Sequence, residues 1–137
     1  MIASVKKDFS LRSRNDNELK QNFPEISELK QLTSNVVVDG ELVVMKHGSP
    51  DFQAMQERAK ATNQRSIERL SHESPATYVI FDILEKDGKD LTDLPFVERK
   101  KILKRSVKEG THVCLVDSID KLGEEYYKIV AKNGLEG

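Results

Sequence analysis

Apolar and polar residues alternate along the chain in patterns that predict several short strands. The first two strand-like segments flank a polar turn at residues 6–8, which is the spacing of a β-hairpin. Two later segments are long and rich in β-branched residues, as expected of strands inside a sheet. The predicted strands cover residues 2–5, 9–14, 35–46, 77–84 and 111–116.

Other segments place apolar residues at helical spacing, so that one side of each predicted helix packs on the protein. Pro24 precedes the first of them, and Asp51 is well placed to cap the second. The irregular order of helices and hairpins predicts an α+β fold. The predicted helices cover residues 25–32, 52–70, 95–107 and 122–134. The first is expected to pack through Ile26, Leu29 and Leu32, and the second through Phe52, Met55 and Ala59. The third is expected to pack through Phe96, Ile102, Leu103 and Val107.

The strand predicted at 35–46 carries two acids, Asp39 and Glu41, on either side of Gly40. A strand that buries both faces has no place for unpaired carboxylates, so these acids need water or a bound partner. An Asp-Gly pair in a β-rich segment is also a common hairpin turn. The pattern alone leaves both interpretations open.

Composition narrows the class of protein. The 137 residues are 37% apolar and 33% charged, which suits a globular domain with a modest core. The 22 basic and 23 acidic residues nearly balance, so no overall charge indicates a nucleic-acid or membrane partner. Cys114 is the single cysteine, and every apolar run is far shorter than the roughly 18 residues of a membrane span. These features predict a cytoplasmic protein.

The sequence lacks the common metal and nucleophile motifs. Its three histidines are far apart, and it has no glycine-rich phosphate loop. Among the remaining side chains, an aromatic ring can stack on a base, carboxylates can bind ribose or Mg²⁺, and an arginine can pair with phosphate. Each residue alone also has a structural explanation, such as a core phenylalanine or a strand-end cation. The candidates are Ser13, Arg14, Asp39, Glu41, Phe81, Asp82 and Glu136.

Several short motifs occur in an informative order. They are SRN, then VVVDGELV with PDFQ, then YVIFDIL with DGKDL and LPFVERKKIL, then NGLEG. This order resembles the adenylation domain of ATP-dependent DNA ligases, most of all the compact ligase modules of bacterial and archaeal end-joining systems. The resemblance covers nearly the whole chain. It implies the fold shared by DNA ligases and mRNA-capping enzymes, in which twisted antiparallel sheets flanked by helices hold ATP between them.

The resemblance also implies roles for individual residues. Arg14, preceded by Ser13, matches an arginine that approaches the nucleotide and the nick. Glu41 matches the carboxylate that contacts the ribose, and Phe81 matches the aromatic residue that stacks on adenine. These residues are therefore expected to bind the nucleotide.

Three further acids follow from the same motifs. Glu136 matches the carboxylate that supports the catalytic Mg²⁺, and Asp39 and Asp82 are expected to support the nucleotide site. Under this interpretation the acids around Gly40 face a nucleotide pocket.

The lysine that defines the family is missing from the sequence. In the family, the lysine of a K-x-D-G motif attacks the α-phosphate of ATP and forms a covalent AMP adduct, but the 137 residues contain no such motif. Lys6 lies only seven residues before Ser13, so we expect it to belong to the hairpin turn. The later K-x-K-type motif and the OB-fold domain are also absent. We expect residues 1–137 to be a partial adenylation domain, truncated at both ends and inactive alone.

The resemblance implies ATP and Mg²⁺ as cofactors and nicked duplex DNA as the substrate of the full-length protein. It further implies DNA repair, recombination and replication in a prokaryotic cytoplasm, with a companion segment as a source of the missing lysine. Two alternatives remain open. One is a fragment of an RNA ligase or a capping-type nucleotidyltransferase, and the other is a non-catalytic nucleotide-binding or assembly module.

Overall fold

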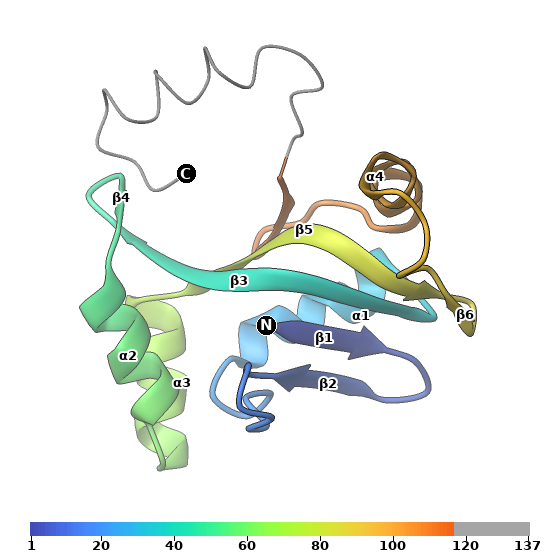
Figure 1. Ribbon diagram of the computed structural model, residues 1–137. Coiled ribbons are helices and arrows are strands. Elements are labelled where there is room, and N and C mark those ends of the chain that lie inside the picture. The colour runs from blue at the N-terminus through green and yellow to red at the C-terminus, as the bar shows by residue number, and fades with distance from the viewer. Residues whose placement is uncertain (117–137) are drawn as a thin grey trace.

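A mixed sheet of seven strands is the framework of residues 1–116, which are the residues that the computed structural model describes (Figure 1). The strands are β1 (Ile2–Val5), β2 (Phe9–Arg12), β3 (Val36–Lys46), β4 (Ser49–Pro50), β5 (Ala76–Lys86), β6 (Lys89–Asp90) and β7 (Val113–Leu115). Five of them follow the order β2-β1-β3-β5-β6, while β4 pairs with β3 and β7 with β5. All pairs are antiparallel except β5 and β7. The predicted α+β fold is confirmed, with one parallel pair added to the expected antiparallel sheet.

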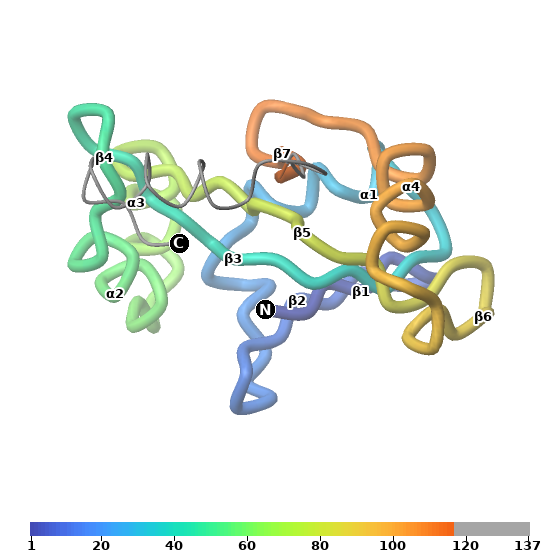
Figure 2. Tube along the Cα trace, turned by 45° about the horizontal axis from the view of Figure 1, so that its top comes forward, coloured from blue at the N-terminus to red at the C-terminus, as the bar shows by residue number. Residues whose placement is uncertain are grey.

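Helices cover this sheet at several places. They are the 3₁₀ helix η1 (Pro24–Glu28) and the α-helices α1 (Leu29–Leu32), α2 (Phe52–Lys60), α3 (Gln64–Glu73) and α4 (Phe96–Ser106). Helix α2 packs on β3, η1 and α4 pack on β5, and α3 packs on α2. Figure 2 shows α2 and α3 near one end of the β3–β5 pair and α4 near the other. None of the helices within residues 1–116 has the length and apolar character needed to cross a bilayer.

Two predicted helices differ from the observed ones. The first begins as η1, with Pro24 in its first turn, and only its last four residues are α-helical. The second is interrupted, because the Asn63 side chain accepts a hydrogen bond from the Ser66 N–H at 2.8 Å and caps a separate helix, α3. Asp51 caps α2 as predicted, accepting from the Ala54 N–H at 2.9 Å.

The packing sides predicted for α2 and α4 are wrong at their first residues. Phe52 and Phe96 are 75% and 50% exposed. Helix α2 instead buries Arg58, and α4 buries Lys100. Arginine and lysine side chains can be buried in this way because their long aliphatic stems pack on apolar surface. The spacing of apolar residues in the sequence does not reveal such buried cations.

A buried ion pair joins α2 to η1 and β5. The side chains of Arg58 and Glu25 are 1% and 7% exposed. Arg58 Nη2 donates to both Glu25 carboxylate oxygens, at 2.6 and 2.8 Å, and to the Asn22 carbonyl at 2.9 Å. Glu25 also accepts from the Ala76 N–H at 2.9 Å, and the Phe23 ring lies 5.0 Å from the guanidinium carbon. One salt bridge thus connects three elements.

Gly40 lies in β3 at a point where β5 leaves no room for a side chain. A Cβ atom at Gly40 would lie 2.6 Å from the Val79 carbonyl oxygen and 2.8 Å from the Tyr78 ring. We therefore expect Gly40→Ala to lower the free energy of unfolding by about 1–3 kcal/mol, because strand or ring must shift. Urea denaturation measures this change. Glu41→Ala, at the exposed neighbouring position, is the control and should change stability by less than about 0.5 kcal/mol; equal stability of both variants would contradict the close packing.

Candidate nucleotide-binding site

Strand register brings distant segments of the chain into one row. Ile2 pairs with Arg12 of β2 and with Asp39 of β3, and Asp39 pairs with Asp82 of β5. Residues next to these pairs therefore also lie side by side across four strands. The register brings together four predicted site residues, and Gly40 lies among them. The four are Ser13, Arg14, Glu41 and Phe81.

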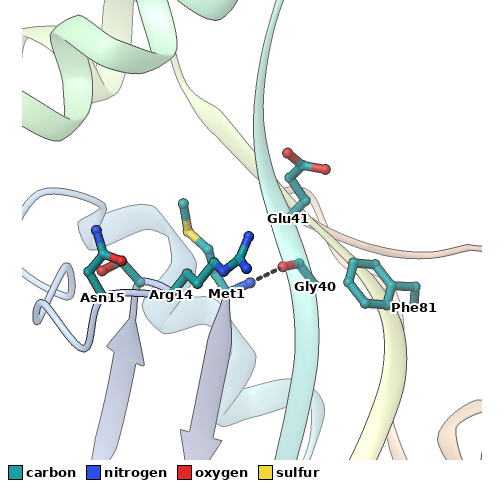
Figure 3. A pocket seen from close by; sticks show the side chains of 7 residues that line it. Met1, Arg14, Asn15, Gly40, Glu41 and Phe81 are labelled. Atoms are coloured by element: carbon teal, nitrogen blue, oxygen red, sulfur yellow. Dashed lines mark hydrogen bonds between the residues drawn. The ribbon is translucent and has the colours of Figure 1, made fainter. Parts of the chain in front are cut away.

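A pocket of about 370 Å³ lies over this row of residues (Figure 3). Arg14 and the Phe81 ring lie on opposite sides of Gly40, with Glu41 nearby (Figure 3). Pockets of this size bind small molecules in many proteins. The lining consists of the predicted residues Ser13, Arg14, Glu41 and Phe81, to which the structure adds Met1, Asn15 and Gly40.

A tight turn after β2 presents Arg14 to the pocket. Ser13 shapes this turn, because its N–H donates to the Asn17 carbonyl at 2.9 Å and its Oγ accepts from the Asn17 N–H at 3.1 Å. Arg12 donates to Asp16 Oδ1 at 2.8 Å, and this hydrogen bond raises the pKa of Arg12. Arg14 itself is exposed, and its guanidinium has no hydrogen-bond or ion-pair partner among residues 1–116. Its charge is available to an anion.

Phe81 lies on the outward face of β5, beside a bulge. Gly40 pairs with Ile80 and Asp39 pairs with Asp82, so Phe81 has no partner in β3. An extra residue of this kind redirects the side chains of its strand. Phe81 is 38% exposed because successive residues of a strand face opposite sides of the sheet, and Ile80 before it faces the core. The explanation of Phe81 as an ordinary core residue is therefore excluded.

The two acids beside Gly40 have different surroundings. Both lie in the continuous strand β3, which excludes a hairpin turn at this point. Glu41 is exposed, lines the pocket and has no hydrogen-bond or ion-pair partner among the described residues. Asp39 accepts hydrogen bonds from the Met1 amino group at 3.1 Å and from the Gly40 N–H at 2.8 Å. Burial, and then the charge of Asp39, raises the pKa of the Tyr78 phenol.

Asp82 lies behind the pocket and contacts α4. Arg99 donates from Nε to Asp82 Oδ1 at 2.9 Å and from Nη2 to Oδ2 at 2.8 Å. This bidentate pairing raises the pKa of Arg99. The side chains of Arg99 and Asp82 are 17% and 14% exposed, so the pair anchors α4 beside the bulge.

Two further predictions concern Glu136 and Lys6. Glu136 and the helix predicted at 122–134 are outside the described residues. Within residues 1–116, no group of three or more His, Cys, Asp and Glu side chains could hold a metal ion. Lys6 lies in the hairpin turn, as predicted, at the end of β1 opposite Met1, and its ammonium group is 2.7 Å from Glu85.

Comparison with known sequences identifies the family. The sequence profile of the ATP dependent DNA ligase domain matches residues 1–137. The chain belongs to this family. The ligase-family resemblance of the motif order is thus confirmed.

Individual relatives agree with this assignment. The ligase-family chain is 28% identical over 138 residues to the SPbeta prophage-derived DNA ligase-like protein LigB of Bacillus subtilis, covering 100% of the chain and 48% of the relative. It is 32% identical over 137 residues to a DNA ligase of Methanocorpusculum labreanum, covering 93% and 24%. A solved mycobacterial DNA ligase D, complexed with ATP and MES, matches with a TM-score of 0.72 and 23% identity over 99% of the chain and 42% of that structure. The chain therefore has the ligase fold and spans less than half the length of each of these proteins.

Proposed function

We propose that this chain forms much of the ATP-binding site of the adenylation domain of an ATP-dependent DNA ligase. The observation that carries the proposal is one pocket lined by the Arg14 cation, the Glu41 carboxylate and the exposed Phe81 ring, from three different strands or turns. Neither charged group has a hydrogen-bond or ion-pair partner within residues 1–116. Exposed aromatic rings and unpaired charges that converge on a pocket are unusual unless a ligand uses them. The family match supports ATP as that ligand.

Each pocket residue has a chemical role in this proposal. Phe81 stacks on the adenine ring, since its exposed face offers the apolar surface that a base needs. Glu41 accepts hydrogen bonds from the ribose hydroxyls, and Arg14 donates to phosphate oxygens. Asp39 and Asp82 act indirectly, because their carboxylates already accept hydrogen bonds from the protein.

Mg²⁺ fits the proposal as a partner of the phosphates. This ion usually takes only one or two protein carboxylates and completes its shell with phosphate oxygens and water. We assign the supporting carboxylate to Glu136, and the bound ion would screen the charge of the polyphosphate.

The nucleophilic lysine is proposed to come from a segment other than these 137 residues. The sequence has no K-x-D-G motif, and Lys6 lies at the end of the β1–β2 hairpin away from the pocket, beside Glu85. We therefore propose that residues 1–137 are part of an adenylation domain, which acts on nicked DNA when joined to the lysine segment and the OB-fold domain. DNA repair, recombination and replication in a prokaryotic cytoplasm are the proposed setting, supported by bacterial and archaeal relatives named as DNA ligases.

Labelling with α-labelled ATP and Mg²⁺ tests this assignment. The purified chain is expected to bind ATP reversibly and to carry no label after denaturation, because its sequence has no K-x-D-G lysine. Adding a segment with the K-x-D-G lysine is expected to produce a stable phosphoramide. Stable label on Lys6 or Lys7 of the chain alone would contradict the assignment. Binding of GTP as tight as that of ATP would favour a capping-type enzyme instead.

A further inference from the structure

Two consecutive cations of α4 hold the two consecutive residues of the β5 bulge. Arg99 forms its bidentate pair with the Asp82 carboxylate. Lys100, the next residue, donates from Nζ to the Phe81 carbonyl at 3.1 Å. The same helix therefore contacts the backbone of one bulge residue and the side chain of the other.

The ammonium group of Lys100 is almost completely buried, which is unusual for a lysine. Its side chain is 5% exposed, and burying an ammonium group is costly unless hydrogen bonds replace the lost water. Besides the Phe81 carbonyl, Nζ donates to the Val116 carbonyl at 2.8 Å, directly after β7. The Phe96 ring lies 5.7 Å away. The ammonium group thus links α4, the bulge and the end of β7.

The bulge interrupts the regular register of β3 and β5 at Phe81. Gly40 pairs with the residue before Phe81 and Asp39 with the residue after it, so Phe81 has no register partner in β3. The direction of the Phe81 ring depends on the orientation of the Phe81 peptide. Within the described residues, Lys100 supplies a hydrogen bond to its carbonyl.

We propose that Arg99 and Lys100 are positioning residues that fix the bulge of β5 and thereby aim the Phe81 ring at the adenine base. This inference rests on the proposed function, since it requires that Phe81 stacks on a nucleotide. Neither cation lines the pocket, so both act through Phe81 and Asp82. Loss of either contact lets the ring leave its stacking position.

A double-mutant cycle with Phe81 tests the inference in the 137-residue chain. Titration with ATP and Mg²⁺ is expected to give a dissociation constant about tenfold higher for Lys100→Met, because most of the base stacking is lost. In a Phe81→Ala background, the same substitution is expected to have no further effect. Arg99→Gln should repeat this pattern and serves if Lys100→Met does not fold, as checked by circular dichroism. Lys101→Met, which removes an exposed cation paired with Glu98, is the control and should bind like the wild type.

Each outcome of the cycle decides between specific claims. Equal weakening of ATP binding with and without Phe81 means a general structural role and overturns the positioning inference. Unchanged binding in both α4 variants overturns it as well. If Phe81→Ala itself binds ATP like the wild type, the proposed stacking fails, and if the wild type binds no ATP, the proposed function fails and the inference with it.

Discussion

Arg58→Met is expected to lower the free energy of unfolding by about 3–5 kcal/mol, as is typical when one partner of a buried ion pair is removed. The substitution keeps an apolar stem in place but leaves the Glu25 carboxylate buried without its bidentate donor. The Asn22 carbonyl loses its donor too. Urea denaturation followed by circular dichroism measures the change.

Two controls separate the buried pair from a general effect of losing an arginine. Arg69→Met removes the cation of an exposed pair with Glu73 in α3 and should change stability by less than about 1 kcal/mol. The double variant Arg58→Met/Glu25→Gln should be more stable than Arg58→Met, because the unpaired charge is gone. Similar losses for Arg58→Met and Arg69→Met would show that the buried pair does not join α2 to the sheet.

Phe81→Ala is expected to raise the dissociation constant of ATP about 5- to 100-fold, which corresponds to the loss of one base-stacking contact. The Phe81 ring is exposed and contributes little to the hydrophobic core, so the variant should still fold. Isothermal titration calorimetry in the presence of Mg²⁺ measures the constant.

Phe52→Ala is the matched control for Phe81→Ala. Phe52 is also an exposed phenylalanine, but it lies at the start of α2 and does not line the pocket. Its removal should leave ATP binding unchanged. Weakened binding in both variants would indicate a general effect on the protein, and unchanged binding in both would remove Phe81 from the site.

Much of the sheet follows from local sequence patterns. Runs of β-branched and apolar residues predict β3 and β5, and the turn at residues 6–8 closes the β1–β2 hairpin as expected. A second turn, at Asp87 and Gly88, joins β5 to β6 with positive φ angles of 51° and 78°. The parallel pairing of β7 with β5 is not predictable in this way, because it depends on how α4 returns the chain to the sheet.

The helices show where local patterns fail. Arg58 and Lys100 are buried because Glu25 and two backbone carbonyls, distant in sequence, receive their hydrogen bonds. A pattern of apolar positions does not contain these distant partners. It therefore predicts that Phe52 and Phe96 lie on the buried sides of α2 and α4. Both phenylalanines are exposed instead, at 75% and 50%.

Part of the pocket lining could be predicted from the sequence because its residues lie in recognisable motifs. Ser13, Arg14, Glu41 and Phe81 come together through strand register, which hydrophobic patterns alone do not specify. The bulge at Phe81 shows in the sequence only as Phe-Asp between apolar residues. The resemblance to DNA ligases indicated that these residues belong together, which their spacing in the sequence does not show.

The most direct test of the nucleotide site is an NMR titration of the ¹⁵N-labelled chain with ATP and Mg²⁺. We predict saturable shifts of the backbone amide signals of Arg14, Gly40, Glu41 and Phe81, which line one pocket. A second hollow, between η1 and α3 and lined in part by Glu68 and His72, should show none and serves as the internal reference. Shifts centred on Glu68 and His72, or no saturable shifts at all, would contradict the assignment of the ATP site.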